Sequence, residues 1–257
     1  MERLSNRKTT EINNNALRAW GLLFLAAGVI GRGIIQTHIL GIGQVSTAQL
    51  LEVISASETA MTLTTLSLVL QAVETCAVPV FTLLLVEGVR HTSDFKAYFL
   101  RIAGLALLSE IPYNLALGGK LLVWNSRNPV FGLVLCMVLL FFFRRYAGTT
   151  FQNILIKVIV TIAAVIWCQM LKIDTGACMV LVTATLWALR EKPLYRNIAG
   201  ATVCIVCSLI SPFFIAAPMG FLAAHFYNGE KSTNSRTVNY LAYPAILLAA
   251  GLIGMAL

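Results

Sequence analysis

The sequence predicts an all-α integral membrane protein, built as a bundle of about nine transmembrane helices. Apolar residues make up 58% of its 257 residues and charged residues only 12%, whereas soluble domains carry about 25% charged residues. The apolar residues gather in stretches of roughly 20, the length that crosses a bilayer as a helix. The basic residues gather on one side once these stretches are placed in alternating directions. Composition, segment length and charge therefore agree on the fold class.

The charge asymmetry also predicts the orientation. Alternating connections place 14 Lys and Arg residues on one face and 3 on the other, and the remaining 2, Arg32 and Lys157, fall inside spans. Basic flanks resist translocation, so the crowded face is expected to be cytoplasmic. The N-terminus is then inside and the C-terminus outside. The net charge of +8 follows from this arrangement, so no nucleic-acid partner is expected.

The spans are assigned from the apolar stretches in chain order. The tract 198–227 is too long for one ordinary span, and Ser211-Pro212 is a natural turn, so the tract is divided into two short spans. With eight spans Lys231 and Arg236 would lie outside, against the charge rule. The nine expected spans are 16–40, 61–89, 95–117, 128–143, 151–171, 174–189, two within 198–227, and 238–257.

Helices two and three are expected to be broken. Glu74 and Pro79 interrupt the second span, and Glu110 and Pro112 interrupt the third. A proline inside a helix removes a backbone donor and leaves a carbonyl unpaired one turn earlier. Such breaks are tolerated in membranes where protein or water satisfies the freed groups. The sequence therefore predicts a kink or a break in each of these spans.

Little of the chain remains outside the spans. Residues 1–15 are expected to form a polar cytoplasmic tail, and 43–59 an interfacial segment on the outer surface. Nine spans of about 20 residues use roughly 180 residues, so we expect a single transmembrane domain over 1–257. Its first partner is the lipid bilayer, and a second membrane protein or another copy of the chain is a further expected partner.

The six cysteines lie in or near apolar segments. Cys204 and Cys207 form a C-x-x-C pair, a spacing known from metal and redox sites. No second ligand pair accompanies them, and small buried thiols are common in apolar helices. We interpret them as packing residues and expect no metal site.

Ionisable side chains inside a bilayer are costly unless they are paired or hydrated. Arg32 in the first span and Glu74 in the second are therefore expected to pair. The pair is either a structural link between helices or part of a substrate site, and the sequence leaves both interpretations open. Lys157 lies near the start of its span, and its long side chain is expected to reach back to the inner surface.

The most polar motif within a span is Glu110-Ile111-Pro112-Tyr113-Asn114. It clusters a carboxylate, a phenol and an amide at an expected bend. Such a cluster forms either a pocket for a small polar ligand, with Glu110 as a general base, or a kink whose polar groups satisfy one another.

A second candidate region lies on the basic face. His91 is the best-placed proton carrier there, since it has an imidazole side chain, and Arg90 and Arg101 are suited to hold phosphate groups. Tyr227 and Asn228 end the eighth span on the same face, where an Asn-Gly pair signals a turn. The alternative for both segments is a solvated loop that only sets the topology.

A series of these motifs resembles the TraX family. No single motif is diagnostic, but their order along most of the chain from about residue 78 onward is specific. The motifs are the stretch from Val78-Pro79 to His91-Thr92, Tyr98-Phe99-Leu100-Arg101, Ser109 to Asn114, Asn128-Pro129-Val130-Phe131, Ile173-Asp174-Thr175-Gly176, Phe226 to Lys231, and Tyr240 to Pro244.

The resemblance implies a multi-pass protein of the bacterial inner membrane. The name-giving members of the family are associated with conjugation and N-acetylate the pilin subunit. The resemblance therefore implies acyl transfer from acetyl-CoA or another acyl-CoA to an amine or hydroxyl of a peptide or small envelope molecule. The expected catalytic residues are His91, as general base, and Glu110. The expected cofactor-binding residues are Arg90, Arg101 and Asn228, and the expected substrate-binding residues are Tyr113, Asn114, Asp174, Tyr227, Tyr243, Arg32 and Glu74.

Two other functions stay open. Family members commonly carry an Asp-His pair in the first span and a His after the Tyr-Pro of the last, where this chain has Gly31-Arg32 and Ala245. This difference favours a second hypothesis, a catalytically diverged membrane subunit that binds a partner or a ligand. The expected broken spans also fit a third hypothesis, a small membrane transporter, although no internal repeat of the kind common in transporters is visible.

Overall fold

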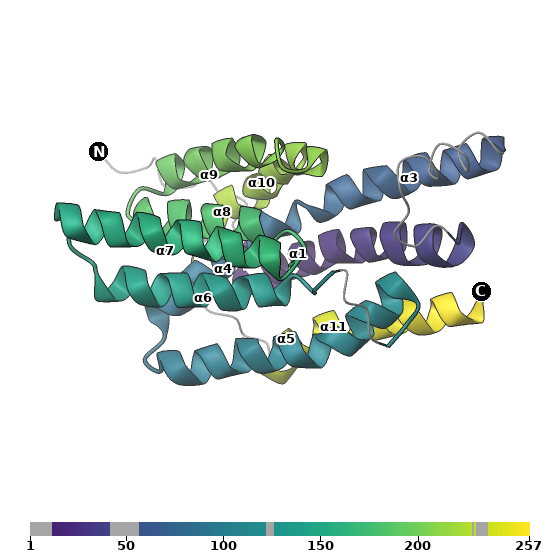
Figure 1. Ribbon diagram of the computed structural model, residues 1–257, viewed down its shortest axis with the longest axis horizontal. Coiled ribbons are helices and arrows are strands. Elements are labelled where there is room, and N and C mark those ends of the chain that lie inside the picture. Colours follow the sequence, from purple (N-terminus) through teal and green to yellow (C-terminus); the bar gives the residue numbers. More distant parts are fainter. Residues whose placement is uncertain (1–11, 42–56, 122–125, 228, 230–235) are drawn as a thin grey trace, which may run out of the picture.

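The computed structural model describes residues 12–41, 57–121, 126–227, 229 and 236–257. This part of the chain forms helices joined by turns and loops, with two isolated backbone bridges, Ile12 to Tyr227 and Arg127 to Ile173, and no strand among the described residues. The helices lie side by side along one long axis (Figure 1). The expectation of an all-α bundle is confirmed.

The first traverse is one continuous helix. α1 (Asn14–Gly28) passes directly into η1 (Val29–Ile39), which has π-helical hydrogen bonding. The side chain of Asn13 accepts a hydrogen bond from the Ala16 N–H at 2.8 Å, and this cap satisfies one of the free amides at the helix start. Arg32 therefore sits in the wider π-helical turn, a feature that often marks functional sites.

The second traverse is divided, as expected. α3 (Glu58–Glu74) ends at Glu74, and α4 (Ala77–His91) begins after Thr75 and Cys76. Pro79 lies in the first turn of α4, where backbone N–H groups have no partner within the helix, so its missing donor costs no helical bond.

The predicted break in the third traverse is wrong. α5 (Phe95–Gly118) runs unbroken through Pro112. A proline in the interior removes one bond from a 24-residue helix, and packing against α6 and α11 holds the remaining turns in place. Gly119 follows the last residue of α5 and caps it, and its φ of 60° is the left-handed conformation that glycine adopts without strain.

The remaining elements complete the bundle, and those before the last helix lie on the side of the molecule away from the C-terminus (Figure 1). From the fourth expected span onward, most helices match the expected bounds closely. The exception is α9, which starts earlier than expected because Pro193 suits the first helical position. The Ser211-Pro212 turn divides the 198–227 tract as expected, and two short 3₁₀ segments follow it. These elements are α6 (Val130–Arg145), α7 (Phe151–Met170), α8 (Gly176–Ala188), α9 (Pro193–Cys207), η2 (Pro212–Ile215), η3 (Ala217–Met219), α10 (Gly220–His225) and the final α11 (Arg236–Ala256).

Four helices of the described chain are long and apolar enough to cross a membrane, over 14–39, 58–91, 95–118 and 151–170. Shorter apolar helices lie at 176–188, 212–225 and 240–256. In α7 only 6% of the most apolar window is buried, so most of its surface is available to lipid. Length and composition therefore support an integral membrane protein.

The basic ends of several helices meet at one end of the bundle. Arg90 at the end of α4 forms ion pairs with Glu87 and with Glu191, which follows α8. Arg144, near the end of α6, donates to the Val89 carbonyl of α4 at 3.5 Å. We call this the basic end. Lys157 lies near the start of α7 and donates to the Gly148 carbonyl in the preceding connection, so it reaches back toward this end as expected.

Two of the expected segments lie largely outside the described residues. Of the tail 1–15 only residues 12–15 are described, and of the interfacial segment 43–59 only residues 57–59. Ser57 caps α3, and Glu58 and Thr59 form its first turn.

Candidate functional site

Arg32 is the centre of an ion cluster within the helical bundle. Its Nη2 donates to both carboxylate oxygens of Glu74, at 2.6 and 2.8 Å, and its Nη1 donates to Oδ2 of Asp174. The expected pairing of Arg32 with Glu74 is therefore present, and Asp174 joins it from the turn between α7 and α8. The third nitrogen of the guanidinium, Nε, is buried without a hydrogen-bond partner.

Glycines bring the helices close enough to form this cluster. A Cβ on Gly28 would lie 2.0 Å from Oε2 of Glu74, so only glycine leaves space for that carboxylate. Gly31 and Gly33 flank Arg32. A Cβ there would lie 2.8 Å from the Ser67 carbonyl oxygen of α3 and 2.6 Å from a carbonyl oxygen of α5, respectively. The small residues therefore allow η1 to pack backbone to backbone against both neighbours, as small residues do in membrane bundles.

Asp174 is positioned by two paired loops. Arg127 and the α7–α8 turn exchange backbone hydrogen bonds, from Arg127 N–H to the Lys172 carbonyl at 2.9 Å and from Asp174 N–H to the Arg127 carbonyl at 3.0 Å. Tyr113 of α5 donates from its hydroxyl to Asp174 at 3.2 Å and lies 3.0 Å from the Ser126 hydroxyl. The loops and α5 thus hold the second carboxylate beside Arg32.

A second polar network lies next to the cluster and uses Glu110. Arg127 donates to Oε1 of Glu110 at 2.8 Å, and the Asn128 side-chain amide donates to Oε2, also at 2.8 Å. The same amide group donates to the Ala106 carbonyl, while the Asn128 Oδ1 accepts from the Val130 N–H. Glu110 therefore anchors the start of α6 to α5, and its oxygens already have protein partners.

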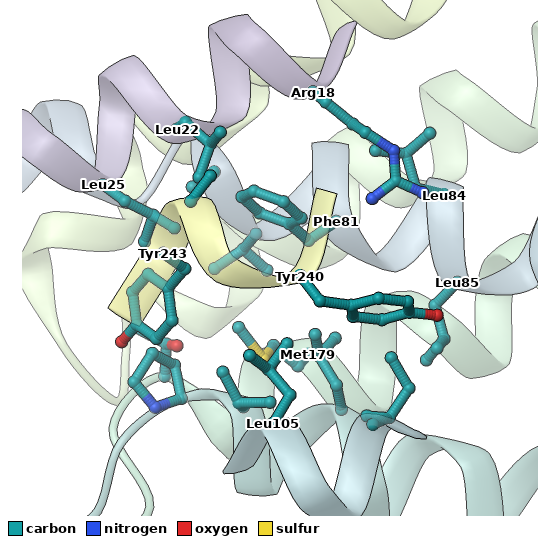
Figure 2. A pocket seen from close by; sticks show the side chains of 18 of the residues that line it. Arg18, Leu22, Leu25, Phe81, Leu84, Leu85, Leu105, Met179, Tyr240 and Tyr243 are labelled. Carbon is teal, nitrogen blue, oxygen red and sulfur yellow. The ribbon is translucent and has the colours of Figure 1, made fainter. Parts of the chain in front are cut away.

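An apolar cavity of about 180 Å³ leads from the basic end toward the ion cluster. Arg18 and Asn15 of α1 line it near the basic end, and Glu74 and Thr175 line it at the cluster. Figure 2 shows the apolar side chains of the lining, with Arg18 and Tyr240 toward one side and Tyr243 toward the other. We call this the apolar cavity.

A second cavity, of about 420 Å³, lies on the other side of the cluster. We call it the polar cavity, because its lining includes Arg32, Asp174 and Lys172, together with Gln71, Gln169, Ser126 and Ser211. Glu74 and Thr175 line both cavities. A carboxylate and a threonine therefore stand where the two cavities approach each other.

His91 lies away from this cluster. Its Nδ1 is 2.9 Å from the Glu87 carbonyl oxygen, and its side chain is 56% exposed. His91 lies two residues after Val89, whose carbonyl accepts from Arg144 near the end of α6. Glu110 accepts from Asn128, which lies just before the start of α6. A helix rises 1.5 Å per residue, so the length of α6 separates the two expected catalytic residues by roughly 20 Å. The structure does not bring them together.

The other expected site residues divide between the cluster and the basic end. Tyr243 is buried and lines the apolar cavity, whereas Asn114 is buried with its Oδ1 unpartnered and its amide 3.5 Å from the Leu121 carbonyl. Arg90 pairs with Glu87, and Arg101 is exposed beside the Tyr98 ring. Tyr227 accepts from the Asn14 amide at 3.2 Å. Asn228 lies outside the described residues.

The cysteines of the described chain are free and buried. Cys178 of α8 lies within hydrogen-bonding reach of Cys204 and Cys207 of α9, so the C-x-x-C pair packs against a third thiol. Among the residues that the structure describes, no group of three or more His, Cys, Asp and Glu side chains is arranged to hold a metal ion.

The order of polar motifs along this fold matches a known family. Residues 48–254 match the TraX protein family over most of the chain. The chain belongs to the TraX family. The match covers every residue of the ion cluster except Arg32, which lies before it in the first helix. Comparison of the chain with curated proteins and with solved structures found no match to either.

Sequence reasoning missed two residues of this TraX-family site. Arg127 is one of the three basic residues of the expected outer face, and in the structure its backbone positions Asp174 and its side chain holds Glu110. Arg18 is one of the 14 basic residues of the expected inner face, and in the structure it lines the apolar cavity. A signal was present in both cases, since each is a cation within a turn or so of an apolar span, where unpaired charge is costly.

Proposed function

We propose that this TraX-family membrane protein transfers an acyl group from a cytoplasmic acyl-CoA to an amine or hydroxyl acceptor at the Arg32–Glu74–Asp174 cluster. One observation carries the proposal: two cavities approach the cluster from different sides and share Glu74 and Thr175. Acyl transfer requires two substrates to meet at one polar centre that holds them in a reactive orientation. Two cavities that meet at an ion cluster suit that requirement.

The proposal includes the expected topology of nine traverses with the basic end in the cytoplasm. Basic loops are retained on the cytoplasmic side of membranes, and the bacterial inner membrane is the compartment in which acyl-CoA is available to that side. In this orientation the apolar cavity is entered from the cytoplasm beside Arg18. The polar cavity then faces the outer half of the bundle.

The apolar cavity suits the acyl end of the donor. A volume of about 180 Å³ with a mostly apolar lining accepts an acyl group and part of the thioester arm, but is too small for the nucleotide. The nucleotide therefore remains at the basic end, where Arg18 and its neighbours offer positive charge for its phosphates. The thioester carbonyl reaches toward Glu74 at the inner end of the cavity.

The cluster offers the groups that the transfer needs. Glu74 accepts the proton of the acceptor amine or hydroxyl as its nitrogen or oxygen attacks the thioester carbon. The buried, unpartnered Nε–H of Arg32 donates to the negative carbonyl oxygen that develops. The carbon–sulfur bond then breaks, and the departing thiolate takes the proton from Glu74. The products are the acylated acceptor and CoA with a free thiol.

The second hypothesis, a diverged subunit without catalysis, has its own support. Both carboxylates already bind the same guanidinium, so the three groups also suit a purely structural link between η1, α3 and the α7–α8 turn. On this hypothesis the cavities hold a ligand or nothing, and no thiol is released.

The third hypothesis, a transporter, predicts a path that opens in turn to each side. Two cavities that meet at Glu74 and Thr175 are compatible with such a path. A transporter moves its substrate across the membrane unchanged, so release of free thiol separates this hypothesis from the first.

The test is thiol release from acetyl-CoA by the purified protein in lipid nanodiscs, with a peptide bearing a free N-terminal amine as acceptor. Glu74→Gln keeps the size of the side chain and removes the base, so turnover is expected to fall about 10²–10⁴-fold. Glu58→Gln, at the exposed far end of the same helix, is the matched control and is expected to retain activity. His91→Ala is also expected to retain it.

Two results would reject this proposal. Loss of turnover in His91→Ala with full activity in Glu74→Gln would place the general base at His91, at the basic end, and not at Glu74. Absence of thiol release and of acetyl-CoA binding by the wild-type protein would leave the diverged subunit or the transporter.

A further inference from the structure

A third cavity, of about 550 Å³, lies at the basic end and is separate from the ion cluster. It is formed where α4, α6 and α8 end and α7 begins. Four cationic side chains line it, from four different segments, together with Trp187. We call it the basic cavity, and its cations are Arg90, Arg144, Lys157 and Arg190.

The described contacts leave positive charge in this cavity. Arg144 donates to the Val89 carbonyl, and Lys157 donates to the Gly148 carbonyl, so each is held by a neutral group. Arg90 and Arg190 share Glu191, at 3.7 and 3.3 Å, and Arg90 also contacts Glu87. Glu87 also pairs with Arg196. Among the described contacts the two carboxylates pair with three arginines, Arg90, Arg190 and Arg196. Arg144 and Lys157 therefore keep their charge without a carboxylate partner in these contacts.

The cationic groups are also partly held in place before any ligand arrives. The Arg190 guanidinium lies 4.8 Å from the centre of the Trp187 ring and donates to the Trp187 carbonyl at 3.0 Å. Arg144 lies 5.8 Å from the centre of the Phe95 ring. A guanidinium carries five N–H donors, so each retains donors for a ligand. Planar, oriented guanidinium groups favour bidentate binding of phosphate.

We infer that the basic cavity binds a phosphate group, supplied either by an anionic phospholipid headgroup or by a soluble nucleotide. The chemistry is the same for both sources, since several cations around one cavity favour an oxyanion with more than one acceptor oxygen. α7 contributes Lys157 to the wall and exposes most of its own surface, which gives a membrane lipid direct access. A phospholipid bound here would be a ligand that the proposed acyl transfer does not require, whereas a bound nucleotide would rest on that proposed function.

The experiment compares two variants with wild-type protein in detergent. Arg144→Gln/Lys157→Gln removes the two cations that lack a carboxylate partner among the described contacts. Arg145→Gln removes the adjacent exposed charge, which does not line the cavity, and is the matched control. The probes are phosphatidylglycerol, phosphatidylcholine and adenosine 3′,5′-bisphosphate, and binding is read by native mass spectrometry and by the shift in unfolding temperature.

Wild-type protein and Arg145→Gln are expected to bind at least one of the two anionic probes, and the double variant is expected to bind that probe at least about tenfold more weakly, because two charge-assisted hydrogen bonds are lost. Binding of phosphatidylglycerol identifies a lipid source, and binding of the bisphosphate identifies a soluble one. Lys157 lies on the lipid-exposed helix α7. The single variant Lys157→Gln therefore replaces the double variant if the latter fails to fold.

Two results would overturn the inference. They are failure of both anionic probes to bind wild-type protein, and equal binding of the bound probe by the double variant. Equal binding of phosphatidylcholine and phosphatidylglycerol would exclude the lipid source. Because Glu74 lies outside this cavity, Glu74→Gln should bind the probe normally, so failure of the acyl-transfer proposal remains distinguishable.

Discussion

Replacing Gly28 with alanine is expected to disrupt the bond between Arg32 and Glu74. A Cβ at position 28 would lie 2.0 Å from Oε2, 2.1 Å from Cδ and 2.5 Å from Cβ of Glu74. Non-bonded carbon atoms favour separations of about 3.5–4.0 Å, so the carboxylate must leave its place. Breaking a buried ion pair costs about 3–5 kcal/mol. Because Asp174 remains beside Arg32, we expect a loss near the lower end, about 3 kcal/mol.

The assay is equilibrium unfolding of the purified protein in mixed micelles, followed by helix content. Gly104→Ala in α5 is the matched control, since a Cβ there meets nothing within 4 Å. Alanine is favoured over glycine in a helix interior by about 0.5–1 kcal/mol, so this control is expected to be neutral or slightly stabilising.

A double-mutant cycle tests the cause of the loss. Glu74→Gly removes all three atoms that the new Cβ would meet, so Gly28→Ala is expected to cost less than about 1 kcal/mol in that background, with the difference appearing as coupling between the two sites. If Gly28→Ala is as stable as Gly104→Ala, or costs the same with and without the Glu74 side chain, the close approach of α1 to α3 is not what holds the ion cluster together.

Two further predictions concern the networks around the site. Asn128→Leu is expected to cost about 3 kcal/mol in the same assay, because it removes the 2.8 Å side-chain donor of the buried Glu110 Oε2 and the side-chain donor of the Ala106 carbonyl. A cost under about 1 kcal/mol would show that other donors replace the amide. Glu191→Gln is expected to change stability by less than about 0.5 kcal/mol, since Glu191 is 72% exposed and its ion pairs are screened by solvent. The same substitution should tighten binding of phosphatidylglycerol at low salt, and weaker binding would contradict the role given to the basic cavity.

Local signals account for most of the helix bounds. The division of the second traverse follows from Glu74 and Pro79, and the turn after α9 follows from Ser211-Pro212. The continuity of α5 does not follow from its sequence, because Pro112 acts on one backbone bond while packing along the whole helix opposes a break. Whether a proline interrupts a membrane helix therefore depends on its neighbours.

The candidate site was predictable only in part. Arg32 and Glu74 were expected to pair because a charge inside a bilayer needs a partner, and they are opposite in sign and on consecutive spans. Tyr113 and Asp174 were expected in a substrate site through resemblance, but their contact with each other and with Arg32 was not. His91 is a candidate because of its side-chain type, which carries no information about its distance from the cluster.

The sequence by itself determined that this chain is a helical membrane protein, which ends of its helices are basic, and that Arg32 requires an acidic partner. These properties depend on composition and on neighbours within a few turns. The tertiary structure alone decided that Asp174, 142 residues away, shares Arg32 with Glu74, and that two cavities meet beside them. The reason is physical: burial and charge pairing act on whichever groups the packing brings together, and glycines 28, 31 and 33 set how closely the helices approach.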